Sequence, residues 1–311
     1  MNGTLLEIQG LAKSYGARPA VAGVSTRLAA GETVALLGPN GSGKTTILRC
    51  VAGLVRPQAG TVLVGGVDAR REPRRARERM AFLPQAPSFP KQSTVRDVLG
   101  LHARLRRVEP RRIEAALAEV GLGTELLGRQ AGELSIGTVH RVALAVACLA
   151  EPELMVLDEP TASLDPMAAG AFRESVRRWR SAGRGVLLAT HLLADAEQLA
   201  DRVVVLVDGR VAADEPIGRL RERLLRRALL RVAVDGPCQA HLEAARAGGA
   251  SEARLNCSDV LVTAPAEQRL EILRRLAEVG PVRGLRTEEP SLESVYLDFV
   301  QGGSDAEVRG I

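Results

Sequence analysis

The run of residues with the clearest chemical meaning is Gly38-Pro39-Asn40-Gly41-Ser42-Gly43-Lys44-Thr45, with Thr46 directly after it. Its glycines allow a tight turn in which successive N–H groups point inward, where they hold phosphate oxygens. At such a site the lysine reaches the β- and γ-phosphates, and the threonine hydroxyl binds Mg²⁺. The apolar stretch Thr33–Leu37 predicts a strand before the run, and Thr45–Ala52 predicts a helix after it. This context favours a phosphate-binding loop for a nucleotide over a chance glycine-rich turn.

A pair of acidic residues follows the apolar stretch Leu154–Leu157, which predicts a strand buried on both faces. Asp158 can hold Mg²⁺ through water, while Glu159 can polarise an attacking water as a general base. Two acidic residues at the end of a buried strand usually mark only the point where the chain leaves the core and reaches solvent. In the same chain as a phosphate-binding loop, they instead indicate hydrolysis of a nucleoside triphosphate.

The order of these motifs resembles that of the ATP-binding subunits of the ABC transporter family, over roughly residues 4 to 225. The resemblance implies that ATP and Mg²⁺ are bound. Tyr15 matches the aromatic residue on which adenine stacks, and Gln85 matches the glutamine that senses Mg²⁺ and links two subdomains. His191 matches the histidine that contacts the γ-phosphate. Alone, His191 would more often be a structural residue at a strand end, but its place about thirty residues after Glu159 favours the match.

The resemblance also implies contacts with a second copy of the chain. Ser163-Leu164-Asp165 matches the loop that crosses to the partner subunit, and Asp165-Pro166 also predicts the start of a helix. The signature of the family, usually Leu-Ser-Gly-Gly-Gln, binds the ATP held by the other subunit. It reads Leu134-Ser135-Ile136-Gly137-Thr138 in this chain. Ser135 is expected to cap a helix that faces this ATP, and Gly137 keeps the close approach of the backbone.

Two signature residues depart from the family pattern. Ile136 keeps its amide N–H, so the anion site survives if the side chain turns away. Thr138 is shorter than the usual glutamine and loses a contact. The alternative interpretation is a weakened signature that makes the site slow or regulatory. If two copies of this chain pair, both sites carry the same changes.

Short apolar runs separated by helical stretches are typical of a parallel α/β sheet. The predicted strands are Thr33–Leu37, Leu154–Leu157, Val186–Thr190 and Val203–Val207, and Asp208-Gly209 predicts a hairpin from the last of these to Arg210–Ala213. Between Lys91 and Ala150 the pattern is helical, as in Ile113–Val120. With the resemblance, this predicts a P-loop NTPase (RecA-like) core with a β subdomain and an inserted helical subdomain, about 88–150, within a nucleotide-binding domain of residues 1–225.

After residue 225 the pattern changes to β-α-β-β-α-β, which predicts a small ferredoxin-like α+β accessory domain over residues 226–302. Its expected elements are Arg231–Val234, a helix His241–Ala247, Arg254–Asn256, Val260–Thr263, a helix Glu267–Val279 and Val282–Arg286. A short helix over Leu292–Val300 closes this domain, and residues 303–311 form a tail. Nothing in this segment carries recognisable chemistry.

Composition excludes several classes of protein. The chain of 311 residues is 46% hydrophobic and 25% charged, which is the balance of a globular protein. The four cysteines form no close pair, which argues against a structural zinc site and favours free thiols in a reducing compartment: Cys50, Cys148, Cys238 and Cys257. Met1–Gln9 shows no signal peptide, and the longest apolar run, Val142–Ala150, is too short to cross a membrane.

The net charge is +5, and arginines gather between residues 70 and 79. Such a cluster can bind nucleic acid or an anionic membrane surface. Acidic residues interrupt it, however, and no aromatic residues are interleaved for base stacking. We therefore expect a solvated face and no nucleic-acid partner.

The resemblance implies an ATPase subunit that forms a nucleotide-sandwich dimer and works against a separate integral-membrane permease, at the cytoplasmic face of the membrane. Ser88–Asp97 is expected to line the groove that receives the permease. The small C-terminal domain and the run Pro290–Tyr296 resemble those of exporter ATPases. An importer ATPase is the first alternative. A soluble, non-transport ABC ATPase is the second, although such proteins usually carry two nucleotide domains or a long coiled-coil insertion. A P-loop kinase would not explain residues 134–138 or 163–165.

Overall fold

The computed structural model describes residues 3–162, 164–225 and 229–288. Within it the chain divides into two compact units, with the boundary between Glu215 and Pro216. The boundary expected from the sequence, at residue 225, lies one helix later, because the first unit ends with the last strand of its large sheet. The expected helix Leu292–Val300 and the tail 303–311 lie outside the described residues.

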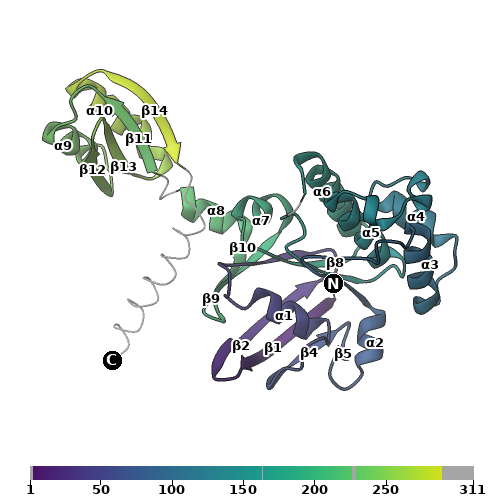
Figure 1. Ribbon diagram of the computed structural model, residues 1–311. Helices are drawn as coiled ribbons and strands as arrows, with labels where there is room; N and C mark the ends of the chain where they lie inside the picture. The colour runs from purple at the N-terminus through teal and green to yellow at the C-terminus, as the bar shows by residue number, and fades with distance from the viewer. Residues whose placement is uncertain (1–2, 163, 226–228, 289–311) are drawn as a thin grey trace. The chain divides into compact units, whose positions relative to one another are not determined.

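The centre of the N-terminal unit is a six-stranded sheet in the order β10-β9-β3-β8-β7-β6. Figure 1 labels β8, β9 and β10 of this sheet. Neighbouring strands from β9 to β6 are parallel. Every residue of β3, β7 and β8 is buried, as expected for strands covered on both faces. The strands are β3 (Thr33–Leu37), β6 (Met80–Leu83), β7 (Leu154–Asp158), β8 (Gly185–Thr190), β9 (Arg202–Val207) and β10 (Arg210–Pro216). The predicted parallel α/β core is confirmed, and β6 is a strand that the sequence analysis did not identify.

A second, antiparallel sheet has the order β2-β1-β4-β5 and forms the β subdomain. Its strands are β1 (Thr4–Tyr15), β2 (Arg18–Ala29), β4 (Ala59–Val64) and β5 (Val67–Asp68). One core of buried aliphatic side chains joins this sheet, the helix α1 (Lys44–Val51) and the large sheet, with Leu6, Ile47 and Leu187 among its members. The helix that carries the phosphate-binding loop is thus fixed between the two sheets.

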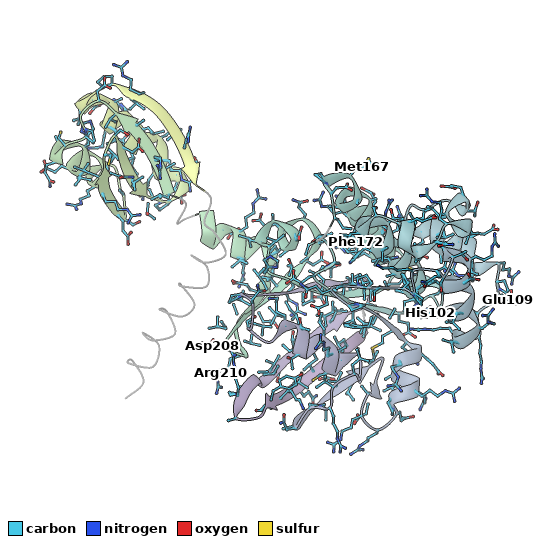
Figure 2. The ribbon with its side chains drawn as sticks, in the orientation of Figure 1. His102, Glu109, Met167, Phe172, Asp208 and Arg210 are labelled. Carbon is cyan, nitrogen blue, oxygen red and sulfur yellow. The ribbon has the colours of Figure 1, made fainter. Side chains whose placement is uncertain are left out.

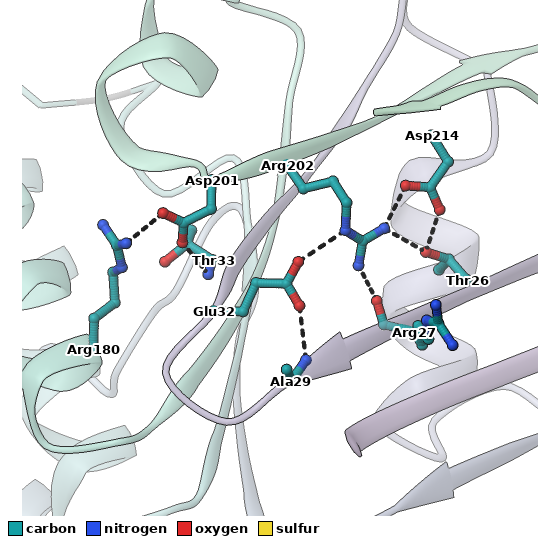
Figure 3. A network of polar contacts seen from close by, with 9 residues as sticks. All are labelled: Thr26, Arg27, Ala29, Glu32, Thr33, Arg180, Asp201, Arg202 and Asp214. Atoms are coloured by element: carbon teal, nitrogen blue, oxygen red, sulfur yellow. Dashed lines mark hydrogen bonds and ion pairs between the residues drawn. The ribbon is translucent and has the colours of Figure 1, made fainter. Parts of the chain in front are cut away.

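Arg202 ties the two sheets together at their edge (Figure 3). Its guanidinium donates to Glu32 Oε1 (2.8 Å from Nε) and to Thr26 Oγ1 (3.3 Å from Nη1). It also contacts the carboxylate of Asp214 and the carbonyl of Arg27. The partners come from β2, β10 and the turn before β3, and the Arg202 side chain is only 18% exposed. Charge-assisted hydrogen bonds of this kind, shielded from water, fix the register between the sheets.

Helices dominate between residues 91 and 150, as predicted. They are α3 (Val95–Arg106), α4 (Arg112–Glu119) and α5 (Ile136–Cys148). Thr94 and Asp97 form a capping box at the start of α3, which satisfies N–H groups that the helix itself leaves unpaired. At the end of α4, Glu119 accepts a hydrogen bond from Trp179 Nε1 at 2.8 Å and pairs with Arg184. These contacts join the helical segment to the large sheet and its covering helix.

The covering helix is α6 (Pro166–Ser181), and its two faces differ (Figure 2). Phe172 is buried and meets Trp179 edge-on with ring centroids 6.2 Å apart, whereas Met167 is 84% exposed. Figure 2 also labels Asp208 and Arg210, at the turn between β9 and β10. This turn confirms the predicted hairpin.

The arginines between residues 70 and 79 are largely paired with acids. Arg71 pairs with Asp68, Arg75 with Glu72, Arg74 with Glu78, and Arg79 with Glu153. These pairs are exposed and contribute little stability individually. They agree with the solvated face that the sequence favoured.

The C-terminal unit opens with α8 (Ile217–Leu225) and continues as a β-α-β-β-α-β arrangement. Its antiparallel sheet has the order β12-β13-β11-β14, so the first strand is central and the last is at an edge. This is the order of a ferredoxin-like fold, and the predicted fold is confirmed. The elements are β11 (Leu229–Val234), α9 (Gln239–Ala247), β12 (Glu252–Asn256), β13 (Asp259–Thr263), α10 (Arg269–Val279) and β14 (Val282–Glu288). Within the described ranges, no helix of either unit is long and apolar enough to cross a membrane.

The buried His140 on α5 makes stability depend on pH. It is 2% exposed, and burial lowers the pKa of its imidazole to about 4. The unfolded chain takes up this proton near pH 6.5, so the N-terminal unit keeps its full stability above that pH. We expect its free energy of unfolding to decrease by about 3 kcal/mol as the pH falls from about 6.5 to about 4. Urea denaturation across this range measures the loss.

The variant His140→Gln should remove most of this dependence; a smaller part remains because burial also lowers the pKa of His102. His102→Gln is the matched control, since His102 is a less buried histidine on α3. An acid loss of the same size in His140→Gln and in the parent chain would contradict the assignment.

Candidate ATP-binding site

The candidate site lies where three adjacent parallel strands end. β3 pairs with β8 and β8 pairs with β7, all in the same direction. Their carboxyl ends therefore share one edge of the sheet, where open α/β sheets bind ligands. The phosphate-binding loop follows β3, the acid pair ends β7, and His191 follows β8. Residues far apart in the sequence thus meet because the strands that precede them are neighbours.

The loop after β3 leaves no room for side chains at two of its glycines. A Cβ atom on Gly38 would lie 2.5 Å from the carbonyl oxygen of Leu206. Gly43, which caps α1, has a φ of 102°, and a Cβ there would lie 2.4 Å from the carbonyl oxygen of Ala20. Only glycine is compatible with such contacts and such a φ. The loop is therefore an open backbone cradle at the start of a helix, which suits phosphate oxygens.

Lys44 is held inside this loop. Its Nζ donates to the carbonyl oxygens of Gly38 at 2.8 Å and Pro39 at 3.1 Å, and lies 3.8 Å from Glu159 Oε1. The residue is 5% exposed, and burial lowers the pKa of its ammonium, against the opposing effect of the Glu159 and Asp158 carboxylates. A phosphate in the loop would give this buried donor an anionic partner.

Thr45 and Asp158 face each other across the site. The Thr45 hydroxyl donates to Asp158 Oδ1 at 3.1 Å. Burial raises the pKa of the Asp158 carboxyl and outweighs the Thr45 hydrogen bond, which lowers it. The Thr45 hydroxyl and the Asp158 carboxylate thus place two oxygen ligands close together, and the carboxylate is largely shielded from solvent. Such ligands fit Mg²⁺. The positions of both residues suit the magnesium role expected from the sequence.

Glu159 and His191 form a pair beside Lys44. Glu159 Oε2 and His191 Nδ1 are 2.8 Å apart, and Glu159 is 6% exposed. The backbone of Glu159 has a φ of 49°, an uncommon value for this residue type, and its N–H donates to the Ala189 carbonyl at 3.0 Å. This bond to β8 aims the carboxylate toward the phosphate loop. The arrangement can accept a proton from a water held there.

A pocket of about 380 Å³ opens over the phosphate loop. Of the residues that the sequence analysis assigned to nucleotide binding, Tyr15, Gln85 and Glu159 line it together with residues of the loop. Tyr15 is 50% exposed, and the Lys13 ammonium lies 5.3 Å from its ring centroid. Its exposed ring is placed for stacking on a base. Arg18, the first residue of β2, also lines the pocket and was missed; its position directly after the turn that follows Tyr15 was the available signal.

Ser135 and Gly137 do not line this pocket. Ser135 is the N-cap of α5, as predicted, and its hydroxyl accepts from the N–H of Thr138 at 3.2 Å. Ile136 is 73% exposed, so its side chain turns away from the protein. A Cβ atom on Gly137 would meet Leu164 at 3.8 Å, an ordinary contact. The start of α5 is thus an exposed helix end, separate from the phosphate loop of the same chain.

The loop after Glu159 leads into α6. Asp165 is the N-cap of this helix and accepts from the N–H groups of Met167 and Ala168, as predicted. Ser163, which precedes it, lies outside the described residues. A feature that the sequence analysis missed is a buried hydrogen bond from the Thr161 hydroxyl to Asp195 on α7 (Leu193–Leu199). This bond joins the segment after Glu159 to the segment after His191.

Comparison with known proteins agrees with these features. A family model described as ABC transporter matches residues 21–162. Nod factor export ATP-binding protein I of Rhizobium meliloti is 38% identical over 212 residues, which are 67% of this chain and 63% of that protein. The daunorubicin resistance ATP-binding protein DrrA3 of Streptomyces coeruleorubidus is 33% identical over 99% of both chains. A solved structure of the ATP-binding subunit of an ABC transporter is 33% identical and covers 70% of this chain and 92% of its own, with a TM-score of 0.65.

The fold and the site define a P-loop nucleotide-binding protein. The relatives narrow the class: the chain belongs to the ABC transporter family, among its ATP-binding proteins. It spans 63% of the length of the Rhizobium meliloti relative.

The hydrogen bond between Thr161 and Asp195 gives a test of how the site is positioned. We expect Thr161→Val to destabilise the N-terminal unit by about 1–3 kcal/mol, because it leaves a buried carboxylate without its donor. It should also lower the kcat of ATP hydrolysis several-fold, with little change in the KM for ATP, since neither residue lines the pocket. Steady-state ATPase kinetics and thermal melting measure the two effects.

Thr161→Ser keeps the hydroxyl and is the matched control, which should recover most of the kcat. An unchanged kcat in a folded Thr161→Val protein would show that this bond does not position the site.

Proposed function

We propose that this chain hydrolyses ATP as the nucleotide-binding subunit of an ABC exporter. The observation that carries the proposal is the convergence of Lys44, Asp158, Glu159 and His191 at one sheet edge, beside a glycine cradle. Each of these side chains has a role in transferring a phosphoryl group to water. Tyr15 and Gln85 line the pocket beside them, which supports their proposed roles toward adenine and the γ-phosphate region.

In the proposed reaction, the cradle and Lys44 hold the β- and γ-phosphates. Thr45 and Asp158, with Gln85 nearby, would hold Mg²⁺, which would supply positive charge to neutralise the phosphates. Glu159 orients a water in line with the γ-phosphate and accepts its proton as the oxygen bonds to phosphorus. His191 orients the Glu159 carboxylate through the 2.8 Å contact, and it is also the proposed contact of the γ-phosphate. ADP and inorganic phosphate are the products.

We further propose that the active form is a head-to-tail dimer. Ser135 and Gly137 lie at an exposed helix start that does not line the pocket of their own chain. An anion-binding helix end of this kind needs a phosphate from elsewhere. A second copy would supply it, and Asp165 would lie in the loop that crosses between the copies.

The partner is proposed to be an integral-membrane permease, with this chain bound peripherally at the cytoplasmic face. The names of two relatives, a Nod factor export ATP-binding protein and a daunorubicin resistance ATP-binding protein, support export. Ser88–Asp97 is the proposed docking segment. In this arrangement residues 1–225 form the nucleotide-binding domain and residues 226–302 an accessory domain.

The variant Glu159→Gln tests the catalytic assignment. The amide keeps the size of the side chain but cannot accept a proton from water, so we expect turnover to fall at least about a hundredfold while ATP binding persists. Because the γ-phosphate then stays in place, ATP should convert the variant to a dimer. ATPase assays and light scattering with and without ATP check both effects.

Adding Ser135→Arg to Glu159→Gln provides the control for the dimer. Ser135 lies on the surface, so the double variant should fold and bind ATP but remain monomeric. Wild-type turnover in a pure sample of Glu159→Gln would contradict the catalytic assignment. A dimer that forms equally well with Ser135→Arg would refute the head-to-tail arrangement.

Transport has a separate test. The tagged chain, extracted from its native membrane in mild detergent, should co-purify with one polytopic membrane protein, and the ATPase rate of the complex should respond to the transported substrate. Purification as a soluble protein with full ATPase activity and no membrane partner would favour the soluble alternative.

A further inference from the structure

Cys238 and His241 form a thiol–imidazole pair in the C-terminal unit that the proposed function does not use. Cys238 is the N-cap of α9 and is exposed, whereas His241, one turn later, is 2% exposed. The Cys238 Sγ and the His241 Nδ1 are 3.3 Å apart. A nucleophile and a base within hydrogen-bond reach are the arrangement that activates cysteines.

The imidazole is held with its acceptor toward the thiol. The backbone N–H of Cys238 donates to Nδ1 at 3.3 Å, so Nδ1 carries the lone pair and Nε2 carries the proton in the neutral ring. Nε2 is buried and has no hydrogen-bond partner within the part of the chain that the structure describes. A Cβ on Gly280 would lie 3.4 Å from Nε2, so the backbone at this glycine packs close to the ring. Among the described residues, the hydrogen-bond contacts of the imidazole are therefore to Cys238.

The pair is not part of a larger cluster of metal-ligand residues among those described. Across the described ranges, no group of three or more His, Cys, Asp or Glu side chains could hold a metal ion. The other cysteines provide a contrast. Burial raises the pKa of the Cys50 thiol to about 11 and raises that of Cys148 further, so both stay protonated and covered. Cys257 is exposed in the turn between β12 and β13 but is not paired with a histidine.

We propose that Cys238 is a site of reversible thiol–disulfide exchange with low-molecular-weight disulfides, with His241 as the general base. Nδ1 accepts the thiol proton, and the Cys238 sulfur attacks one sulfur of the small disulfide. The S–S bond of the reagent breaks, a mixed disulfide forms on Cys238, and the leaving thiolate takes up the proton. The reagent is the oxidant, and a small thiol reverses the reaction.

The test compares Cys238 with Cys257 in the full-length chain. Oxidised glutathione at pH 7 is the probe, and peptide mapping by mass spectrometry follows the mixed disulfide at each cysteine with time. We expect Cys238 to react at least about tenfold faster than Cys257 in the native protein, because general-base assistance commonly contributes more than this. In 6 M guanidinium chloride the two rates should become similar, since the pair is then lost.

His241→Gln provides the second arm. The glutamine can still accept the backbone N–H but is no base for the thiol, so the native rate at Cys238 should fall toward that of Cys257. Cys238→Ser is the blank, and circular dichroism checks that the C-terminal unit is folded. A native rate at Cys238 no greater than at Cys257 would overturn the proposal, as would a folded His241→Gln protein that reacts as fast as the parent. If His241→Gln does not fold, the native comparison of the two cysteines decides.

Discussion

The candidate site depends on the parallel pairing of β7, β8 and β3. Each strand is wholly buried, so its polar residues can lie only where the strand ends. Because the strands run in the same direction, those ends share an edge, and the phosphate loop, Asp158 and His191 meet there without any local sequence relation. A reversed central strand would carry its polar end to the opposite edge. The chemistry therefore rests on strand order and direction before it rests on any single side chain.

Burial then determines how the charges at this edge are arranged. Lys44 and Glu159 are 5% and 6% exposed, and each would be costly to bury alone. They lie 3.8 Å apart, with loop carbonyls bound to the lysine and His191 bound to the glutamate. The groups that would act on ATP therefore also satisfy one another. Side chains arranged in this way are ordered before a ligand binds, so binding does not include the free-energy cost of ordering them.

Much of this could be predicted from sequence because the motifs are local and the strands are continuous apolar runs. The ferredoxin-like order of the C-terminal unit also followed from the alternation of strand and helix patterns. Two kinds of feature could not be predicted: a short strand without a clear pattern, and contacts between distant segments. β6 is only four residues long and follows a helix rich in arginine, so no periodicity marks it. The Thr161–Asp195 bond and the Arg202 network join residues whose separation in sequence carries no signal.

The departures in the signature have a structural consequence that can be argued from hydrogen-bond capacity. Ser135 Oγ lies 2.9 Å from Thr138 Oγ1 and accepts from the Thr138 N–H. A serine hydroxyl has two acceptor sites and one donor. When Thr138 donates to it, both acceptor sites of Ser135 are filled and its own proton is left for an anion. In that direction of the bond, Thr138 turns the Ser135 proton away from itself, while Ile136, whose side chain is exposed, keeps its N–H at the helix start. The altered signature therefore still has a capping serine hydroxyl and backbone N–H groups at the helix start, which are the groups that an anion would need.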